Sequence, residues 1–488
     1  TLRMNQEYGI HWFRRDLRVP GNPALLWNAR EHDGRVLGLF CFDAAFLGRT
    51  DFSANRFQFF LQTLRQLRLD LRDQGGDLLI LDKGPDEAFP LLWQAISKCG
   101  QPLPQSCGWN RDYEPFARAR DARIERHLTQ QGTRIHITRD HLLIEPHEVY
   151  RGNDPDAGYQ VYTPFARRWK DVFHTENVQQ RLRDMRRSAA LKLRWADILG
   201  AEHPLLQTDT LELYMEENSR QVTIASMPAA GHRAAREQLR VFTRRLDQYA
   251  VQRDFPAIPA TSGLSVYFKN GSITVADVIA ELHKEYETSP AYQKFFQELI
   301  WREFFYHILF RNPRVEREAF QTRYRKIKWK HNARWFQAWQ TGRTGFPIVD
   351  AGMRELMRTG NMHNRVRMIV ASFLVKDLLI DWRRGEEHFM HLLLDGDLAA
   401  NNGGWQWAAS TGCDAQPYFR IFNPWTQSKK FDADGEYIRR WIPELKSIPA
   451  TELHKAEGER GDEYPRPIVN HAVQREQALA LFKTSGAE

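Results

Sequence analysis

Long hydrophobic runs and paired cysteines are both missing from this chain of 488 residues. The longest apolar stretch, residues 369–375, is interrupted by Ser372, whereas a membrane helix needs about 20 apolar residues. The N-terminal segment, residues 1–9, lacks the apolar core of a secretory signal. The four cysteines form no CxxC motif and are too few for a disulfide framework in a chain of this size. These absences argue against membrane-spanning and disulfide-stapled classes, and we expect a cytoplasmic, monomeric protein with free thiols.

Glycine-rich phosphate loops are also missing from the N-terminal part, although its pattern suits a nucleotide-binding fold. Short apolar runs alternate with amphipathic stretches, which is typical of βαβ units around a parallel sheet. The candidate strands are residues 8–13, 35–43, 77–84, 106–111 and 133–138. No GxGxxG or GxxxxGK motif follows any of them. The sequence therefore predicts a doubly wound α/β domain over residues 1–145 that would hold a nucleotide without the usual loop.

Strand signals become scarce after Gly231, where helical periodicity takes over. The candidate helices are residues 232–249, 274–287, 290–310, 347–359, 362–380 and 386–394. Residues 146–230 show turn signals and charge but no clear period, which indicates an irregular inter-domain connection. We therefore predict an all-α second domain over residues 231–488. It holds nine of the fifteen tryptophans, more than packing ordinarily requires, which favours stacking on a flat ligand or electron transfer.

The charge balance favours a polyanionic partner without requiring one. The formal net charge is +8, and five basic residues fall within residues 323–330 together with Tyr324 and Trp329. A basic segment of this kind is more often a solvated face than a binding site. Charge alone therefore does not identify the function.

Three local groups of residues carry a stronger chemical signal. Residues 395–407 combine two acids, two asparagines and two indoles with glycines that allow close approach of a ligand. Asn364 and Met368 are one helical turn apart, and Glu298 and Trp301 share another helix face. Each residue alone would be read as structural, but their clustering favours a site. A metal site is the weaker alternative, because His388 and His391 share a helix face without a clear third ligand.

The chain resembles the DNA photolyase and cryptochrome family in residues 12–18, 261–265, 298–304 and 401–424, and it is most similar to bacterial class I cyclobutane pyrimidine dimer photolyases. This resemblance implies an antenna-binding α/β domain and a helical domain that holds FAD, active as the reduced anion. It also implies a deoxyribodipyrimidine photo-lyase that acts on ultraviolet-damaged DNA, double or single stranded. Electron transfer from excited flavin to a flipped-out dimer would split the dimer.

Site residues follow from the resemblance position by position. The residues expected to bind FAD are Tyr249, Thr261, Ser262, Gly263, Leu264, Ser265, Arg302, Asn364, Arg367, Asp395, Asp397 and Asn401. Arg367 would pair with Asp395 beside the isoalloxazine, Asp397 would bond the ring edge, and Asn401 would face N5. The backbone N–H groups and hydroxyls of the small-residue turn suit the phosphates.

The resemblance likewise assigns the DNA, electron-transfer and antenna residues. The residues expected at the lesion or DNA are Arg253, Glu298, Trp301, Asn364, Arg365, Met368, Trp407 and Arg420. Glu298 is expected to be shielded from water, protonated and able to donate to the dimer. The tryptophans expected to carry electrons are Trp405, Trp382 and Trp329. The residues expected at the antenna chromophore, 8-hydroxy-5-deazaflavin or alternatively methenyltetrahydrofolate, are Phe40, Cys41, Asp112, Glu114, Arg120 and Lys269.

Related functions remain as alternatives. A cryptochrome-type blue-light receptor would use the same fold, but no long extension follows Val469 to carry an output signal. Animal-type (6-4) photolyases have two histidines where this chain has Asn364 and Met368. The DASH branch commonly has tyrosine at the position of Trp407. Dimer repair is therefore the favoured hypothesis.

Overall fold

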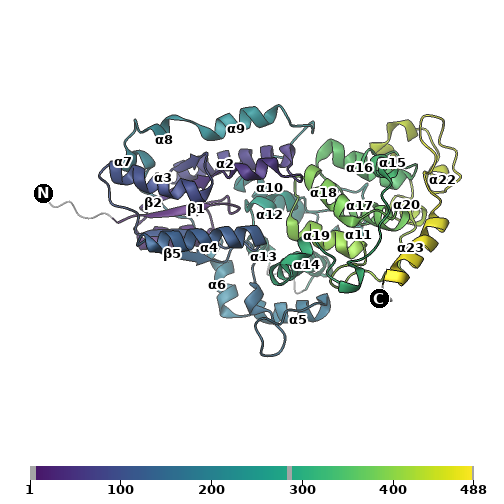
Figure 1. Ribbon diagram of the computed structural model, residues 1–488, viewed down its shortest axis with the longest axis horizontal. Helices are drawn as coiled ribbons and strands as arrows, with labels where there is room; N and C mark the ends of the chain where they lie inside the picture. Colours follow the sequence, from purple (N-terminus) through teal and green to yellow (C-terminus); the bar gives the residue numbers. More distant parts are fainter. Residues whose placement is uncertain (1–6, 283–287, 486–488) are drawn as a thin grey trace.

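The computed structural model describes residues 7–282 and 288–485. Its N-terminal part is built on a five-stranded, all-parallel sheet in the order β3-β2-β1-β4-β5 (Figure 1). The strands are β1 (Gly9–Phe13), β2 (Val36–Cys41), β3 (Leu78–Leu81), β4 (Ser106–Asn110) and β5 (Arg134–Thr138). Each predicted strand is confirmed, with ends that differ by three residues at most.

Helices cover both faces of this sheet, so that each face has its own apolar core. The helices are α1 (Pro23–Glu31), α2 (Ala54–Asp73), α3 (Pro85–Lys98) and α4 (Pro115–Gln130). Ser53 caps α2 by accepting a hydrogen bond from the Arg56 N–H at 3.2 Å, and Phe57, Leu61 and Leu64 pack inward as their spacing predicts. The direction of strand succession reverses between β1 and β4. In open α/β sheets, ligands bind beyond the carboxyl ends of the strands near such a reversal.

The C-terminal part is helical, as predicted. Its helices are α10 (His232–Thr243), α11 (Tyr249–Gln252), α12 (Ser265–Asn270), α13 (Val275–Leu282), α14 (Pro290–Arg311), α15 (Ala333–Gln340), α16 (Pro347–Thr359), α17 (Asn364–Ser372), α18 (Trp382–Leu392), α19 (Leu398–Ala408), α20 (Pro424–Phe431), α21 (Glu436–Trp441), α22 (Ala450–Leu453) and α23 (His471–Ser485). Two predicted helices are divided. Residues 232–249 contain α10, a 3-10 turn at Leu246–Gln248 and only the first residue of α11, and α17 continues as a π-helical turn, Phe373–Asp377. Residues 283–287 of the predicted helix 274–287 lie outside the described residues.

The irregular structure expected for residues 146–230 is wrong, because five helices form there. They are α5 (Tyr162–Phe173), α6 (Glu176–Asp184), α7 (Trp195–Leu199), α8 (Pro204–Gln207) and α9 (Thr210–Ser219). α5 packs on α14, and α6 packs on α13, so this part joins the core of the helical region. α7 and α9 return to the sheet domain, where the Trp195 indole N–H donates to the Gly38 carbonyl at 2.7 Å. These helices are short and separated by turns, which hides their periodicity in the sequence.

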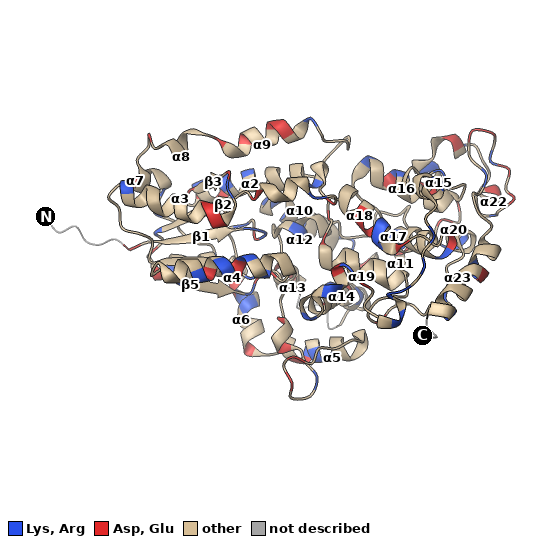
Figure 2. Ribbon diagram, in the orientation of Figure 1, with Lys and Arg blue, Asp and Glu red and all other residues tan. Residues whose placement is uncertain are grey.

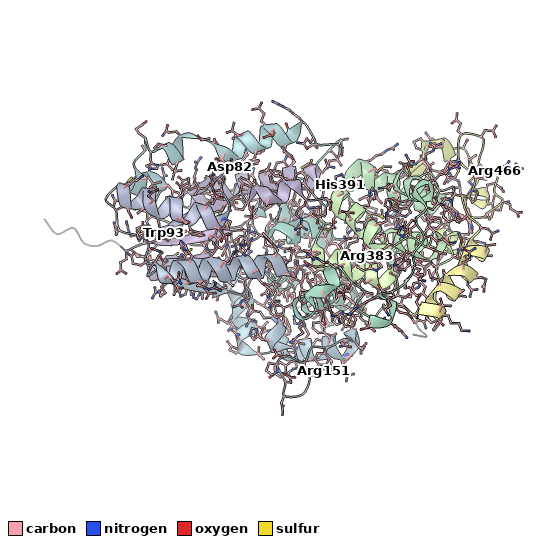
Figure 3. The ribbon with its side chains drawn as sticks, in the orientation of Figure 1. Asp82, Trp93, Arg151, Arg383, His391 and Arg466 are labelled. Atoms are coloured by element: carbon pink, nitrogen blue, oxygen red, sulfur yellow. The ribbon has the colours of Figure 1, made fainter. Side chains whose placement is uncertain are left out.

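The two halves lie end to end, with the sheet domain at one side of the view and α20 to α23 at the other (Figure 1). Figure 3 shows Trp93 in the sheet half, Arg466 near the far end and His391 between them. His391 lies at the junction, since its Nδ1 is 2.7 Å from the carbonyl oxygen of Phe52. Lys and Arg residues occur along both halves, so the basic residues are not confined to one of them (Figure 2).

The helices and cysteines of the described residues bear on the class of the chain. Over residues 7–282 and 288–485, every helix is too short or too polar to span a bilayer. All four cysteines are free thiols, with Cys107 and Cys413 buried and the other two half-buried.

Candidate functional site

A cavity of about 530 Å³ opens at the carboxyl edge of the sheet, where the sheet domain meets the helical region. The ends of β1, β2 and β4 form one wall, and α2, α4 and α12 close the others. Its lining includes all six residues predicted for the antenna, namely Phe40, Cys41, Asp112, Glu114, Arg120 and Lys269. The structure therefore brings together residues that are as far as 229 positions apart in the sequence.

Cationic side chains dominate the polar lining of this cavity. Its six cations are Arg14, Arg15, Arg49, Arg56, Arg120 and Lys269, and its three acids are Asp43, Asp112 and Glu114. Burial lowers the pKa of the Lys269 amine, and Glu114, 3.6 Å away, partly offsets that effect. Burial raises the pKa of the Asp112 carboxyl, but Arg15 and Arg120 lower it below its ordinary value. A flat ligand with negative charge fits this combination of aromatic walls and excess cations.

Sequence reasoning missed four of these cations, Arg14, Arg15, Arg49 and Arg56. Arg56 donates to the carbonyl oxygens of Asp51 and Leu393, both at 3.0 Å, and so ties α2 to the end of α18. Burial lowers its pKa to about 10. The sequence signals only two of these four arginines. Arg14 and Arg15 directly follow a predicted strand, where the carboxyl edge of a parallel sheet faces a ligand.

Arg15 connects the cavity to the helical region through a buried ion network. It donates to Glu114 at 2.6 Å on the cavity wall, and to Tyr306 and Asp397 at 2.8 Å on the helical side. Burial raises the pKa of Asp397, but Lys269, Arg15 and Arg302 lower it well below its ordinary range. Asp397 also caps α19 by accepting from the Ala400 N–H at 3.2 Å.

This network changes the expectation for Asp397. Its carboxylate oxygens are bonded by Arg15, Tyr306 and the α19 backbone, so the structure shows it as an interface residue and helix cap. The hydrogen bond to the flavin ring edge stays a prediction. Arg302 also lies in this network, where its guanidinium is 2.7 Å from Nε2 of His141. Burial lowers the pKa of His141 well below its ordinary value, so the ring is neutral.

Of the other residues predicted around the isoalloxazine, Arg367 lies on α17, Asn401 lies on α19, and Asp395 lies in the turn between α18 and α19. Arg367 and Asp395 form the expected ion pair at 2.9 Å. The Asn401 amide N–H donates to the carbonyl oxygen of Glu386 at 3.0 Å, which leaves its Oδ1 as the atom that can accept from a ligand. Glu386 is buried, and burial raises its pKa to about 8; the Asn402 amide donates to its carboxyl at 3.0 Å.

The small-residue turn predicted for the FAD phosphates lies before α12. Gly263 has a φ of +66°, a left-handed conformation that suits glycine. The Ser262 hydroxyl accepts from the Leu264 N–H at 3.3 Å, and Thr261, Gly263 and Ser265 are exposed. Tyr249 on α11 is buried, with the Arg253 guanidinium 5.3 Å from its ring centre. This turn offers exposed hydroxyls and N–H groups to a phosphate. The segment from α17 to α19 adds an acceptor amide and an ion pair, and together these groups fit a flavin dinucleotide.

The residues predicted at the lesion gather on α14, α17 and α19, and we call Glu298, Trp301, Asn364, Met368 and Trp407 the lesion cluster. Asn364 Nδ2 lies 3.9 Å from Sδ of Met368, as their one-turn spacing predicts. The helices α14 and α19 pack together, as do α17 and α19. α14 and α19 come so close at Gly403 that a Cβ there would lie 2.2 Å from the Phe305 ring. Trp301 and Trp407 are each one turn from that point.

Glu298 departs from its expected state. Its carboxylate accepts from Arg253 at 2.5 Å, with Lys294 Nζ 3.9 Å away, and its side chain is 30% exposed. The structure therefore shows Glu298 partly exposed and paired with a cation rather than shielded from water, and its donation to the dimer stays a prediction. The sequence shows only helical spacing on α14 and does not reveal that Arg253, 45 positions earlier, faces this carboxyl.

Of the arginines predicted at the DNA backbone, Arg253 contacts Glu298 of this cluster and Arg365 follows Asn364 on α17. Arg365 pairs with Asp254 at 2.9 Å, next to Arg253, and its guanidinium lies 4.4 Å from the Phe431 ring centre. Arg420 lies in an exposed loop between α19 and α20, beside the exposed Phe419.

The three predicted electron-transfer tryptophans lie in one apolar core of the helical region. Trp405 and Trp382 are each only 2% exposed, whereas Trp329 is half-buried. The Trp405 ring fits against Gly385 of α18, where a Cβ would lie 2.2 Å from it. Lys330, next to Trp329, donates its backbone N–H to Leu379 at 2.8 Å, three residues before Trp382. Trp329 is therefore the most exposed of the three, and the order in which Trp405 and Trp382 pass electrons stays a prediction.

The metal alternative gains no support. The described ranges contain no group of three His, Cys, Asp or Glu side chains that could hold a metal ion. His388 Nδ1 instead lies 3.2 Å from the Gln340 amide nitrogen, and burial lowers its pKa to about 4.

Comparison with known proteins covers nearly the whole chain. A family model described as DNA photolyase matches residues 9–183, and one described as the FAD binding domain of DNA photolyase matches residues 295–484. A deoxyribodipyrimidine photo-lyase from Synechococcus sp. is 38% identical over an alignment of 484 positions that covers 97% of this chain and 96% of that protein.

Solved structures agree with this match. A bacterial class III photolyase from Agrobacterium tumefaciens has a TM-score of 0.83 at 34% identity and covers 100% of this chain and 99% of its own. An archaeal photolyase from Sulfolobus tokodaii, described with two FAD molecules, has a TM-score of 0.80 at 30% identity over 98% of this chain and 99% of its own.

Proposed function

The chain belongs to the DNA photolyase family, and we propose that it is a deoxyribodipyrimidine photo-lyase that uses light and FAD to split cyclobutane pyrimidine dimers in DNA. The observation that carries this proposal is the full-length match to a protein of that name, together with the lesion cluster on α14, α17 and α19. Its substrate is ultraviolet-damaged DNA, double or single stranded, and it acts as a monomer.

FAD supplies the photoexcited electron donor when it is bound. The turn from Thr261 to Ser265 would hold its phosphates, since exposed N–H groups and hydroxyls suit that charge. Arg367, paired with Asp395, would place positive charge beside the ring and favour the reduced anion. Asn401 would offer its Oδ1 to N5, because Glu386 already holds its amide nitrogen.

Trp301 and Trp407 would stack on the flipped-out dimer, as aromatic rings do with unpaired bases. Arg253 separates from Glu298 in this proposal when a DNA phosphate competes for its guanidinium, and Glu298 is then free to bond a pyrimidine. Asn364 and Met368 would complete the contact on the α17 side.

The antenna chromophore is proposed to be 8-hydroxy-5-deazaflavin, bound in the cavity at the carboxyl edge of the sheet. Its ionisable hydroxyl gives it an anionic form, which the six cations of the lining would stabilise, Lys269 above all. Methenyltetrahydrofolate is one alternative. A second flavin is another, because the Sulfolobus photolyase is described with two FAD molecules. Mass spectrometry of the chromophore bound in the native host would decide among them.

The test of the repair function uses reduced holoenzyme and an oligonucleotide carrying one thymine dimer, with an undamaged copy as the control. We expect tighter binding to the damaged strand and recovery of thymines under blue light, with none in the dark. Equal binding to both strands and no recovered thymine would favour a blue-light receptor instead. Repair of a (6-4) photoproduct but not of the dimer would favour the (6-4) photolyase alternative.

A further inference from the structure

Tyr162, at the start of α5, covers one face of the Trp301 indole. The two rings are stacked with their centres 3.8 Å apart and their planes 3° from parallel. Tyr162 is only 7% exposed, and Trp301 is half-buried. Phe304 and Phe305 meet the same indole at larger angles, with centres 5.6 Å and 5.7 Å away. The stack with Tyr162 therefore fixes the plane of the indole.

The hydroxyl of Tyr162 reaches the same helical turn. It donates to the carbonyl oxygen of Gln297 at 3.1 Å, directly before Glu298. Glu298 also raises the pKa of the Tyr162 phenol, together with burial, which has the larger effect. Tyr162 thus contacts both the ring and the backbone of the turn that carries two members of the lesion cluster.

The backbone beside Tyr162 is tied to the other aromatic member of the cluster. The Tyr162 N–H donates to the Asp414 carboxylate at 2.9 Å, and the Cys413 thiol contacts the Gln160 carbonyl oxygen at 2.8 Å. Cys413 and Asp414 follow the end of α19, which carries Trp407. The start of α5 therefore connects the helices that carry Trp301 and Trp407.

We propose that Tyr162, a residue of the segment between the two domains, is a positioning residue for lesion recognition that holds Trp301 in the plane required to stack on a flipped-out pyrimidine. The proposal depends on the lesion role given to Trp301 above. Because Tyr162 covers one face of the indole, a base would stack on the opposite face. A rigid indole loses less conformational entropy when a base stacks on it.

The test compares binding of FAD-loaded variants, in the dark, to a duplex with one thymine dimer and to the undamaged duplex. Tyr162→Leu removes the ring, and we expect it to weaken dimer binding about three- to tenfold, the range for an aromatic pair, with no change for undamaged DNA. Tyr162→Phe keeps the ring and should stay close to the wild type. Tyr159→Leu is the matched control, since Tyr159 contacts Phe165, 6.5 Å between ring centres, in the same connection.

The outcomes separate this proposal from the proposed function. Trp301→Ala should lose at least about fivefold in dimer affinity. If the wild type itself shows no preference for the dimer, the lesion assignment fails. If Trp301→Ala loses the preference but Tyr162→Leu keeps it, the role of Tyr162 is overturned, and a loss in Tyr162→Phe as large as in Tyr162→Leu overturns the stacking argument. If the Tyr162→Leu protein loses FAD or melts at a lower temperature than the wild type, Tyr162→Met replaces it in the test.

Discussion

The cavity at the edge of the sheet and the lesion cluster are built from different chemistry. The cavity places six cations and three acids around aromatic walls. The lesion cluster has two indoles, an amide, a thioether and the carboxyl of Glu298, which pairs with Arg253 outside the cluster. Buried charge selects a ligand of fixed charge and shape, whereas an aromatic face accepts any base that can reach it. The first suits a resident chromophore, and the second suits a substrate that must enter and leave.

The largest effect is expected from Arg15→Gln, because Arg15 lines the cavity and also bonds Tyr306 and Asp397 of the helical region. The change leaves Asp397 and Glu114 without their shared cation in a buried setting. Removing one partner of a buried ion pair costs about 3–5 kcal/mol, and we expect that loss in the free energy of unfolding measured with denaturant. Arg123→Gln is the control, since its pair with Asp86 is exposed and contributes about 1 kcal/mol or less. Equal losses in both variants would show that the network does not join the halves.

The next effect separates the two sites. Trp407→Ala should weaken dimer binding by about 1–3 kcal/mol, the range for one stacked base, and leave antenna binding unchanged. Lys269→Met should do the reverse: the chromophore loses affinity because its cation is gone, but dimer binding and repair by directly excited FAD persist. Dimer binding by filter retention and chromophore retention by absorbance measure the two quantities. A variant that impairs both would show that the sites are not independent.

A smaller effect is expected on the pH dependence of stability. It tests whether the helical region, like the cavity, contains a buried ionisable group that titrates with a shifted pKa. The folded pKa of Glu386, about 8, exceeds its unfolded value, so the native state binds more protons between pH 5 and 8. Its contribution to stability is complete below the unfolded pKa and is lost as pH rises through 8. Glu386→Gln mimics the protonated form, so we expect its free energy of unfolding to fall less steeply with rising pH than that of the wild type. The slope due to one proton cannot exceed about 1.4 kcal/mol per pH unit.

The control for that prediction is Glu387→Gln, because Glu387 is the neighbouring residue and is exposed. Burial also raises the pKa of Glu303 to about 7, so Glu303 contributes to the pH dependence of every variant. The contribution of Glu386 is therefore the difference between the wild-type and variant curves of unfolding free energy against pH. If the difference curve for Glu386→Gln is flat from pH 5 to 8, the carboxyl does not titrate as described.

The same comparison explains what the sequence could predict. Strands and long helices followed from their periodicity, and the pair of Asn364 and Met368 followed from helical spacing. The residues of the cavity were named only through the family resemblance, since nothing local links Lys269 to Glu114. Contacts that cross between elements stayed hidden: Arg15 with Asp397, Arg253 with Glu298, and Tyr162 with Trp301. Such contacts depend on how helices dock, which no periodicity records.

The smallest effect on repair is expected from Trp329→Phe, which tests whether electron supply is separate from the lesion cluster. Trp329 packs at the surface on Phe482, with ring centres 5.9 Å apart, while Trp382 and Trp405 lie buried behind it. Phenylalanine fills most of the same space but is much harder to oxidise than an indole. Photoreduction of oxidised FAD with an external reductant should therefore slow severalfold, whereas repair by chemically reduced protein should match the wild type. Trp441→Phe, another half-buried indole packed against the same core, should change neither rate. Equal losses of photoreduction and repair in Trp329→Phe would place Trp329 in the repair step itself, and the division between electron supply and lesion binding would then be wrong.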